Sequence, residues 1–325
     1  FTSGSNEIAP CADHVCRPAW RIHLVRGCPH KCFYCGLCGP PMTLMMNVEE
    51  YIGKLAELAA KNPWQKTWLY EDDSEALAQE PEFGGLPAIM EWCAQSDDNY
   101  VIVHTKSANV DWLRDFPHQG RTILVWSLTA ETQSTLMEPG SATTRERIEA
   151  AAKCHAWGYQ TRFKFKPIVP VVNWREELGE MIRLVGQTTH PDVISLFTLA
   201  WMDYAELVRL ADTSLIDPRF LAGAAAAAEE LGNIKVRPFP HDLRREIYEY
   251  CIDEVRRYLP KVPISICTES LTMWQELGPK LDLTPGTYPC GCGPQATPGL
   301  AKLPVNPWKV ARPVAVEGDP QPIGG

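Results

Sequence analysis

The chain has 325 residues, of which 45% are hydrophobic and 22% are charged, and its formal net charge is -9. This composition excludes a disordered chain, allows one large core, and argues against a protein that wraps a polyanion through its own positive charge. No apolar run reaches the ~18 residues of a membrane-spanning helix and we find no signal-peptide pattern, so we expect a soluble, cytoplasmic protein with no membrane partner.

Predicted strands and helices alternate along most of the chain. Strands are expected at 20–26, 64–70, 100–104, 122–128, 160–169, 193–199 and 262–267, and helices at 48–61, 84–95, 107–115, 144–157, 174–185, 203–212, 218–231 and 241–258. This α/β alternation predicts a parallel sheet with right-handed crossovers.

From residue 278 onward, the chain becomes rich in Pro and Gly. Such composition favours loops over a second globular unit. We therefore expect three parts: an N-terminal extension at 1–19, the α/β unit at 20–277, and a loop-rich C-terminal extension at 278–325.

Three cysteines, Cys28, Cys32 and Cys35, directly follow the first predicted strand with the spacing Cys-x3-Cys-x2-Cys. A loop of this length can place three thiolates around a [4Fe-4S] cluster and leave the fourth iron open, whereas structural zinc needs a closed set of four ligands. Cys38 continues the x2 spacing and is an alternative ligand, which we interpret as a spare thiol.

This pattern resembles the signature of radical S-adenosylmethionine (SAM) enzymes, and Tyr34 is usual before the last cysteine of that signature. The resemblance implies that SAM binds the open iron, and that the six strand-helix units after the loop form a partial, open (β/α)6 barrel.

Polar residues at the carboxyl ends of the predicted strands are the candidates for binding SAM, because sites in parallel α/β sheets form at that edge. Asp73 and Ser74 follow the second strand and could hold the SAM ammonium, while Lys106 follows the third and could pair with the SAM carboxylate. Solvated loop groups or helix caps are the alternative interpretation for each residue.

Further stretches resemble the spore photoproduct lyase branch of this superfamily over roughly residues 21–275. They are Met46–Glu50, Val103–Lys106, Leu124–Ser127, Glu138–Gly140 with Arg145–Ala151, Gly158–Tyr159, and Pro167–Pro170 with Trp174. The resemblance implies an enzyme that reverses a thymine photodimer in DNA, with Lys106 and Ser127 near SAM and Tyr34 near the radical site. It also implies a reductant of the flavodoxin or ferredoxin type.

One departure from that family concerns the hydrogen donor to the product radical. The lyase has a cysteine after the second strand, whereas residues 70–76 contain none here, and Gly36 replaces a second tyrosine. Ser74 and Tyr34 are the catalytic candidates, although a serine hydroxyl cannot replace a thiol as donor because its O–H bond is far stronger.

We therefore expect a radical SAM enzyme with a nucleotide-like substrate, which includes modified pyrimidines in DNA, or with another small polar substrate. The reaction type, whether lyase, isomerase or decarboxylase, stays open. Two alternatives stay open as well: a DNA photoproduct lyase proper, and an iron-sulfur electron-transfer or scaffold protein without SAM chemistry.

Four further cysteines lie outside the predicted barrel: Cys11, Cys16, Cys290 and Cys292. Four thiolates could bind structural zinc or a second [4Fe-4S] cluster, with Cys267 as a substitute ligand. We favour a second cluster over zinc, and thiols without metal are the alternative.

Overall fold

The computed structural model describes residues 2–3, 14–16, 19–37, 41–293 and 295–304. At its centre, seven parallel strands form one sheet in the order β2-β5-β6-β7-β8-β9-β10. These strands are β2 (Trp20–Ile22), β5 (Thr67–Tyr70), β6 (Tyr100–Thr105), β7 (Thr122–Leu128), β8 (Gln160–Ile168), β9 (Ile194–Thr198) and β10 (Ile264–Ile266).

The sheet stays open. A short strand, β1 (Thr2–Ser3), pairs antiparallel with β2 at one edge, and β10 forms the other edge. A separate antiparallel pair, β3 (Val25–Arg26) and β4 (Thr43–Leu44), flanks the cysteine loop. The predicted fold class, an α/β fold with an open, parallel sheet that forms a partial barrel, is confirmed.

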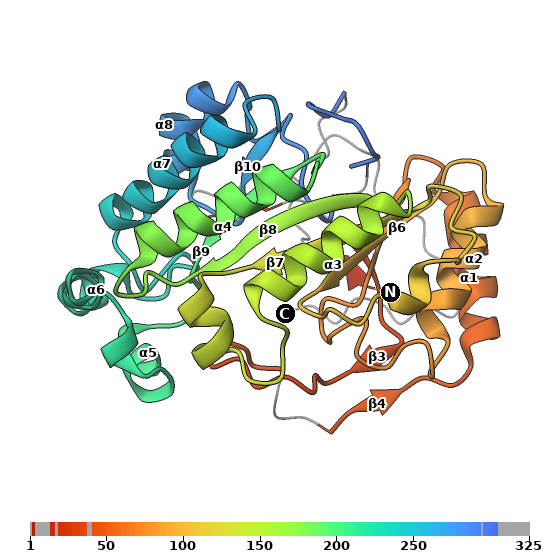
Figure 1. Cartoon of the computed structure of the whole chain (residues 1–325), viewed down its shortest axis with the longest axis horizontal. Helices are drawn as coiled ribbons and strands as arrows, with labels where there is room; N and C mark the ends of the chain where they lie inside the picture. Colours follow the sequence, from red (N-terminus) through yellow and green to blue (C-terminus); the bar gives the residue numbers. More distant parts are fainter. Residues whose placement is uncertain (1, 4–13, 17–18, 38–40, 294, 305–325) are drawn as a thin grey trace.

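Helices connect the parallel strands, and Figure 1 shows α3 and α4 side by side over one face of β7 and β8. The helices are α1 (Val48–Lys61), α2 (Gly85–Gln95), α3 (Thr144–Ala156), α4 (Trp174–Thr188), α5 (Tyr204–Leu210), α6 (Pro218–Leu231), α7 (His241–Tyr258) and α8 (Leu271–Leu281). Single turns are η1 (Asp111–Leu113), the π-helical η2 (Gln133–Met137) and η3 (Thr213–Leu215). Within the described residues, no helix combines the length and the apolar character needed to cross a bilayer.

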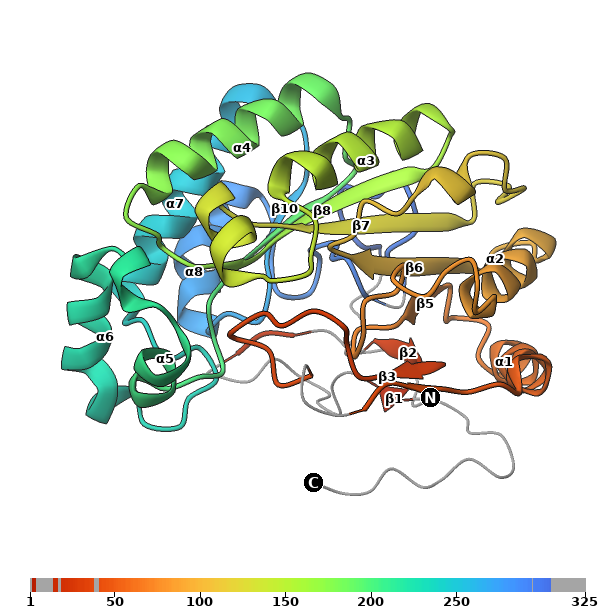
Figure 2. The same ribbon diagram turned by 60° about the horizontal axis from the view of Figure 1, so that its bottom comes forward.

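The two faces of the sheet differ because side chains alternate along each strand. Val103 and Leu124 belong to the main core with the helices, whereas Ile102, Ile123 and Val125 form a small separate cluster on the opposite face. We call the second face the inner face. The cysteine loop, red in Figure 2, passes close to the strand ends.

The secondary structure departs from the expected pattern in three places. Residues 107–115 form only the turn η1, because Asn109 directs its side-chain amide to the carbonyl oxygens of Leu77 and Glu80 instead of continuing a helix. The strand expected at 20–26 is divided between β2 and β3. Helix α8 was not expected, and it crosses residue 278, where the loop-rich extension was expected to begin.

Candidate functional site

A buried carboxylate fixes the point at which the chain enters the cysteine loop. Glu71, the first residue after β5, accepts hydrogen bonds from the backbone N–H groups of Leu24 and, at 2.8 Å, of Val25. Its own N–H donates to the carbonyl oxygen of Ile22 at 3.1 Å. Because Glu71 is fully buried, it ties the start of the loop firmly to the carboxyl end of β5.

The cysteine loop docks on the segment 137–140, which follows β7 and η2. Gly140 has φ +89°, and a Cβ at this position would lie 3.2 Å from the Nδ1 atom of His30, so glycine permits the close approach. Two backbone hydrogen bonds complete the contact: Lys31 N to Pro139 O at 3.0 Å, and Phe33 N to Met137 O at 3.3 Å.

The three thiols of the loop are held at different depths. Cys32 is buried, whereas Cys28 and Cys35 are half-buried. Burial raises the pKa of the Cys28 thiol to about 11 and also raises the pKa of Cys32. Three cysteine side chains on one loop are nevertheless the kind of ligand that iron-sulfur clusters take in proteins, so this donor set fits a [4Fe-4S] cluster with three protein ligands.

A buried network centred on Glu138 lies beside the loop. Its Oε1 atom accepts hydrogen bonds from the Tyr34 hydroxyl at 2.5 Å, from Lys106 Nζ at 2.7 Å and from Gln133 Nε2 at 3.2 Å, and its Oε2 atom accepts one from Arg147 Nη2 at 2.5 Å. Burial opposes ionisation of Glu138, but Lys106 and Arg147 outweigh it and lower the Glu138 pKa to about 2. Glu138 is therefore a carboxylate at neutral pH.

A third buried carboxylate, Glu75, fixes the backbone at the end of β6. It accepts hydrogen bonds from the Thr105 hydroxyl and, at 2.8 Å, from the Lys106 N–H, and His30 Nε2 lies 3.7 Å from it. Lys106 is thus held at two points, its backbone by Glu75 and its ammonium group by Glu138.

The other predicted SAM-binding residues come from two places: Asp73 and Ser74 share the connection after β5, and Ser127 lies near the carboxyl end of β7. The Asp73 side chain is 44% exposed, with an oxygen 3.9 Å from His23 Nδ1. The Ser74 hydroxyl oxygen is buried and has no hydrogen-bond partner among the described residues. Ser127, at the end of β7, accepts a hydrogen bond from Arg147 Nη1 through its carbonyl oxygen at 2.9 Å.

The structure therefore brings Tyr34 and Lys106 together, with the Lys106 ammonium 2.5 Å from the Tyr34 hydroxyl. Sequence reasoning missed Glu138, Arg147 and Glu75 as organisers of this site. The signal available for Glu75 was its place in the acidic segment that follows the end of β5. Glu138 and Arg147 belong to stretches that resemble the family, but neither stands at a strand end, because a π-helical turn separates Glu138 from β7 and Arg147 lies inside α3.

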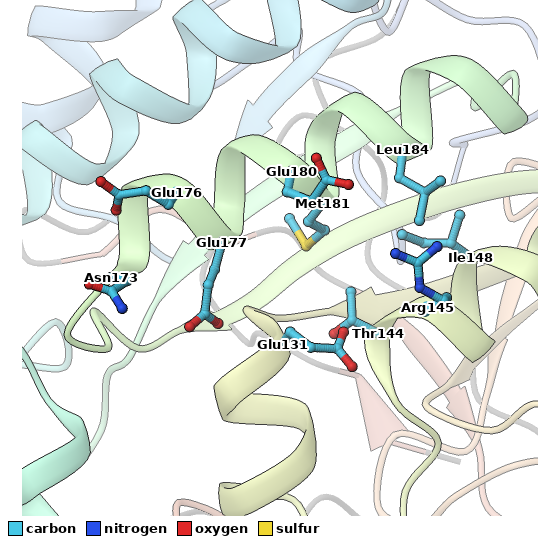
Figure 3. A pocket seen from close by; sticks show the side chains of 10 residues that line it. All are labelled: Glu131, Thr144, Arg145, Ile148, Asn173, Glu176, Glu177, Glu180, Met181 and Leu184. Carbon is cyan, nitrogen blue, oxygen red and sulfur yellow. The ribbon is translucent and has the colours of Figure 1, made fainter.

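A cavity of about 650 Å³ lies elsewhere, between α3, α4 and the end of β7 (Figure 3). Glu131, Glu176, Glu177 and Glu180 line it together with apolar side chains. Glu177 is engaged in structure, because it accepts hydrogen bonds from the Thr132 N–H at 2.7 Å and the Thr132 hydroxyl at 2.6 Å. We therefore place the candidate site at the cysteine loop and not at this cavity.

The remaining predicted ligands fall into two groups. Cys11 and the alternative ligand Cys38 lie outside the described residues. Cys16, Cys290 and Cys292 gather with the predicted substitute, Cys267, at a second location that is described below.

Comparisons with known proteins agree with this architecture. The family model described as spore photoproduct lyase matches residues 15–204. Curated relatives include the spore photoproduct lyases of Clostridium acetobutylicum, 24% identical over 52% of this chain and 53% of the relative, and of Bacillus subtilis, 28% identical over 54% of this chain and 53% of the relative. The chain thus spans about half the length of the curated relatives it matches.

Solved structures of spore photoproduct lyase share the fold. A double mutant with bound AdoMet and dinucleoside spore photoproduct aligns with a TM-score of 0.63 and 17% identity, over 80% of this chain and 79% of that chain. A lyase complexed with dinucleoside spore photoproduct aligns with a TM-score of 0.62 and 17% identity, over 77% of this chain and 75% of that chain. Because the family model covers more than half of the sequence, this chain belongs to the spore photoproduct lyase family.

Proposed function

We propose that this chain is a radical SAM enzyme whose site lies at the carboxyl ends of β5, β6 and β7. The observation that carries the proposal is the docking of the three-cysteine loop on residues 137–140, beside the contact of Tyr34 with Lys106 and Glu138. A [4Fe-4S] cluster on Cys28, Cys32 and Cys35 would, with SAM bound, supply one-electron cleavage of SAM and thereby hydrogen-atom abstraction.

The chain's own residues would bind and orient SAM. A lysine ammonium has three N–H donors, and Tyr34 and Glu138 engage two of those on Lys106, which leaves one for the SAM carboxylate. Asp73 supplies a partly exposed carboxylate for the SAM ammonium, and the Ser74 hydroxyl is available as an acceptor beside it. Ser127 lies at the next strand end and is the fourth proposed contact.

The proposed substrate is a nucleotide-like molecule with a modified pyrimidine, as free nucleotide or in DNA. This class is supported by the curated relatives, which are named spore photoproduct lyases, and by solved relatives that hold a dinucleoside photoproduct. Residues 70–76 contain no cysteine, so a different group would return hydrogen to the product radical. Tyr34 is the proposed group, because its phenol, whose pKa burial raises well above the ordinary value, keeps its proton at neutral pH. Transfer of the hydrogen atom would leave a tyrosyl radical, which one electron from the flavodoxin-type reductant and one proton would return to the phenol.

The test is anaerobic reconstitution with iron and sulfide, followed by a flavodoxin-type reductant, SAM and a dinucleoside spore photoproduct. We expect 5'-deoxyadenosine by chromatography, together with loss of the photoproduct or its conversion to a product other than the repaired dinucleoside. Quantitative repair would favour a photoproduct lyase proper with another hydrogen donor. A fully loaded cluster that yields no 5'-deoxyadenosine would contradict the proposal and leave an iron-sulfur electron-transfer protein.

A further inference from the structure

A second group of cysteines lies away from the loop of Cys28, Cys32 and Cys35. Its members come from three distant parts of the chain: Cys16 from the N-terminal segment, Cys267 from the end of β10, and Cys290 with Cys292 from the C-terminal segment. Cys290 and Cys267 are buried, and Cys16 and Cys292 are half-buried. Cys16 lies within electrostatic range of Cys267 and Cys292, and the sulfur atoms of Cys290 and Cys292 are 4.0 Å apart.

Cys16 is held in place through the backbone of its neighbour Val15. Val15 pairs with Glu269 in an isolated bridge, in which the Val15 N–H donates to the Glu269 carbonyl oxygen at 2.6 Å. Arg244 in turn fixes the Glu269 carboxylate at 3.0 Å, and both side chains are buried. Cys16 is thereby set beside the end of β10, where the Cys267 N–H donates to Leu196 O at 2.8 Å.

The C-terminal contributors lie against the inner face of the sheet. His104 Nε2 on β6 is 2.8 Å from the Gly291 carbonyl oxygen, and the Thr67 hydroxyl donates to the carbonyl oxygen of Gly293. A Cβ at Gly291 would lie 2.5 Å from Lys164 Cε, so the segment runs in close contact with β8. Cys290 and Cys292 are therefore anchored on strands of the barrel.

A buried cation accompanies these thiols. Lys164 on β8 is 3% exposed, its Nζ lies 3.0 Å from His104 Nε2, and Cys267, Cys290 and Cys292 lie within its electrostatic range. Within the described part of the chain, no carboxylate oxygen lies within 4.0 Å of this ammonium group. Buried charges in proteins are normally paired, which makes an anionic thiolate site the natural partner of Lys164.

From this juxtaposition we propose that Cys16, Cys267, Cys290 and Cys292 bind a second iron-sulfur cluster on the inner face of the barrel. Thiolate-only ligation suits zinc or iron-sulfur and not magnesium or calcium. A tetrahedral zinc site with Zn–S bonds of 2.3 Å would bring its four sulfurs to about 3.8 Å from one another. The sulfurs of Cys290 and Cys292, 4.0 Å apart, are near that spacing, but no three cysteine sulfurs in the described ranges lie within 4.8 Å of one another, so the group as a whole does not have the close spacing of a zinc site.

Four protein ligands leave no open iron, so this cluster would not bind SAM. The second cluster goes beyond the proposed function, because its four ligands are separate from Cys28, Cys32 and Cys35 and it could form with or without the SAM-binding cluster. Ligands drawn from both ends of the chain would also couple cluster binding to folding of the extensions onto the barrel.

The test is metal and acid-labile sulfide analysis of four anaerobically reconstituted proteins. These are the wild type, a triple variant Cys28→Ala/Cys32→Ala/Cys35→Ala, a double variant Cys290→Ala/Cys292→Ala, and a matched control Cys93→Ala/Cys154→Ala. The control replaces buried cysteines on α2 and α3. We expect two to four irons beyond the four of the loop in the wild type and the control, loss of that excess in the double variant, and its retention in the triple variant.

The triple variant separates this proposal from the proposed function. Its remaining iron should give an electron paramagnetic resonance signal after reduction that added SAM does not change. An iron-free triple variant, with a wild type that holds about four irons, would overturn the second site while leaving the loop cluster intact. One zinc per chain that disappears in the double variant would overturn the iron-sulfur assignment. Because the excess iron and sulfide can be measured on the wild type without any variant, the proposal stays testable even if a variant misfolds.

Discussion

Arg147 donates to Glu138 across 2.5 Å, and both side chains are fully buried. The pair joins α3 to the segment that receives the cysteine loop, and Lys106 approaches the other carboxylate oxygen of Glu138. One carboxylate therefore balances two cations at the place where three strand ends meet the loop. The consequences of removing its charge can be measured without any cofactor.

Glu138→Gln is expected to destabilise the fold by about 3–5 kcal/mol, because removing one partner of a buried ion pair leaves uncompensated charge. Urea unfolding of the apoprotein measures this loss. The matched control is Glu180→Gln on α4, whose partner Arg183 is exposed, and it should cost less than about 1 kcal/mol. Equal effects of the two substitutions would contradict the assigned role of Glu138.

The difference in unfolding free energy between the wild type and Glu138→Gln should depend on pH. The Glu138 pKa is about 2 in the folded chain and 4.5 ordinarily, so its stabilisation is complete above the ordinary value and is lost as pH falls through the folded value. The difference in unfolding free energy should therefore be constant near neutral pH and shrink between about pH 5 and pH 2. A difference that stays unchanged down to pH 3 would show that the charge of Glu138 is not its source.

The sequence pattern predicted the parallel strands and most helices well, because hydrophobic periodicity and turn residues are local signals. The helix predicted at 107–115 does not form, because local polar groups compete with the helical hydrogen bonds. The Asn109 side chain binds the β5–α2 connection, and the Asn109 N–H donates to the Ser107 hydroxyl oxygen. Helix α8 was missed because Gly278 and Pro279 suggested a loop, although Ser270 caps its start.

In the candidate site, too, the residues with a local sequence signal were predicted and the long-range contacts were not. Cys28, Cys32 and Cys35 were recognisable because their spacing lies within a few residues. The partnership of Lys106 with Glu138 spans 32 residues, and the contact of Tyr34 with Glu138 spans 104. The same limit explains the second cysteine group, in which Cys267 was predicted only as a substitute ligand. Such contacts depend on the register of β6, β7 and β8, which no local pattern specifies.

Replacing Cys28, Cys32 and Cys35 together by Ala should abolish the brown absorption near ~400 nm of the loop cluster and leave at most the signal of the second site. SAM cleavage should be lost as well. Absorption spectra and iron analysis measure the first effect, and chromatography of 5'-deoxyadenosine measures the second. Full iron content in this variant would refute the ligand assignment.

Lys106→Ala should weaken SAM binding by roughly tenfold to a hundredfold, since a lost charged hydrogen bond costs about 1.5–3 kcal/mol. Ser127→Ala should act in the same direction with a smaller effect, because its hydroxyl is neutral. Isothermal titration of the reconstituted protein with SAM measures both. Lys153→Ala, which removes an exposed lysine on α3, is the control and should leave the affinity unchanged.

Asp73→Asn tests the proposed contact to the SAM ammonium. The Asp73 side chain is 44% exposed, so the substitution should leave the fold intact and reduce SAM affinity by several-fold. Asp98→Asn is the matched control, because Asp98 is a similarly exposed aspartate whose partner is Lys66. Equal SAM affinities for the two variants would show that Asp73 does not contact the ligand.

Tyr34→Phe separates hydrogen return from SAM binding, because it removes a single oxygen. The ring keeps its edge contact with Phe33, whose centroid lies 5.1 Å away, while Lys106 still reaches Glu138 at 2.7 Å. Cluster content and SAM affinity should therefore change little. Substrate conversion per 5'-deoxyadenosine formed should fall sharply if the phenol returns hydrogen to the product radical. The ratio of the two products, measured by chromatography with a dinucleoside photoproduct, decides the role of Tyr34. An unchanged ratio would assign Tyr34 to positioning Lys106 and Glu138.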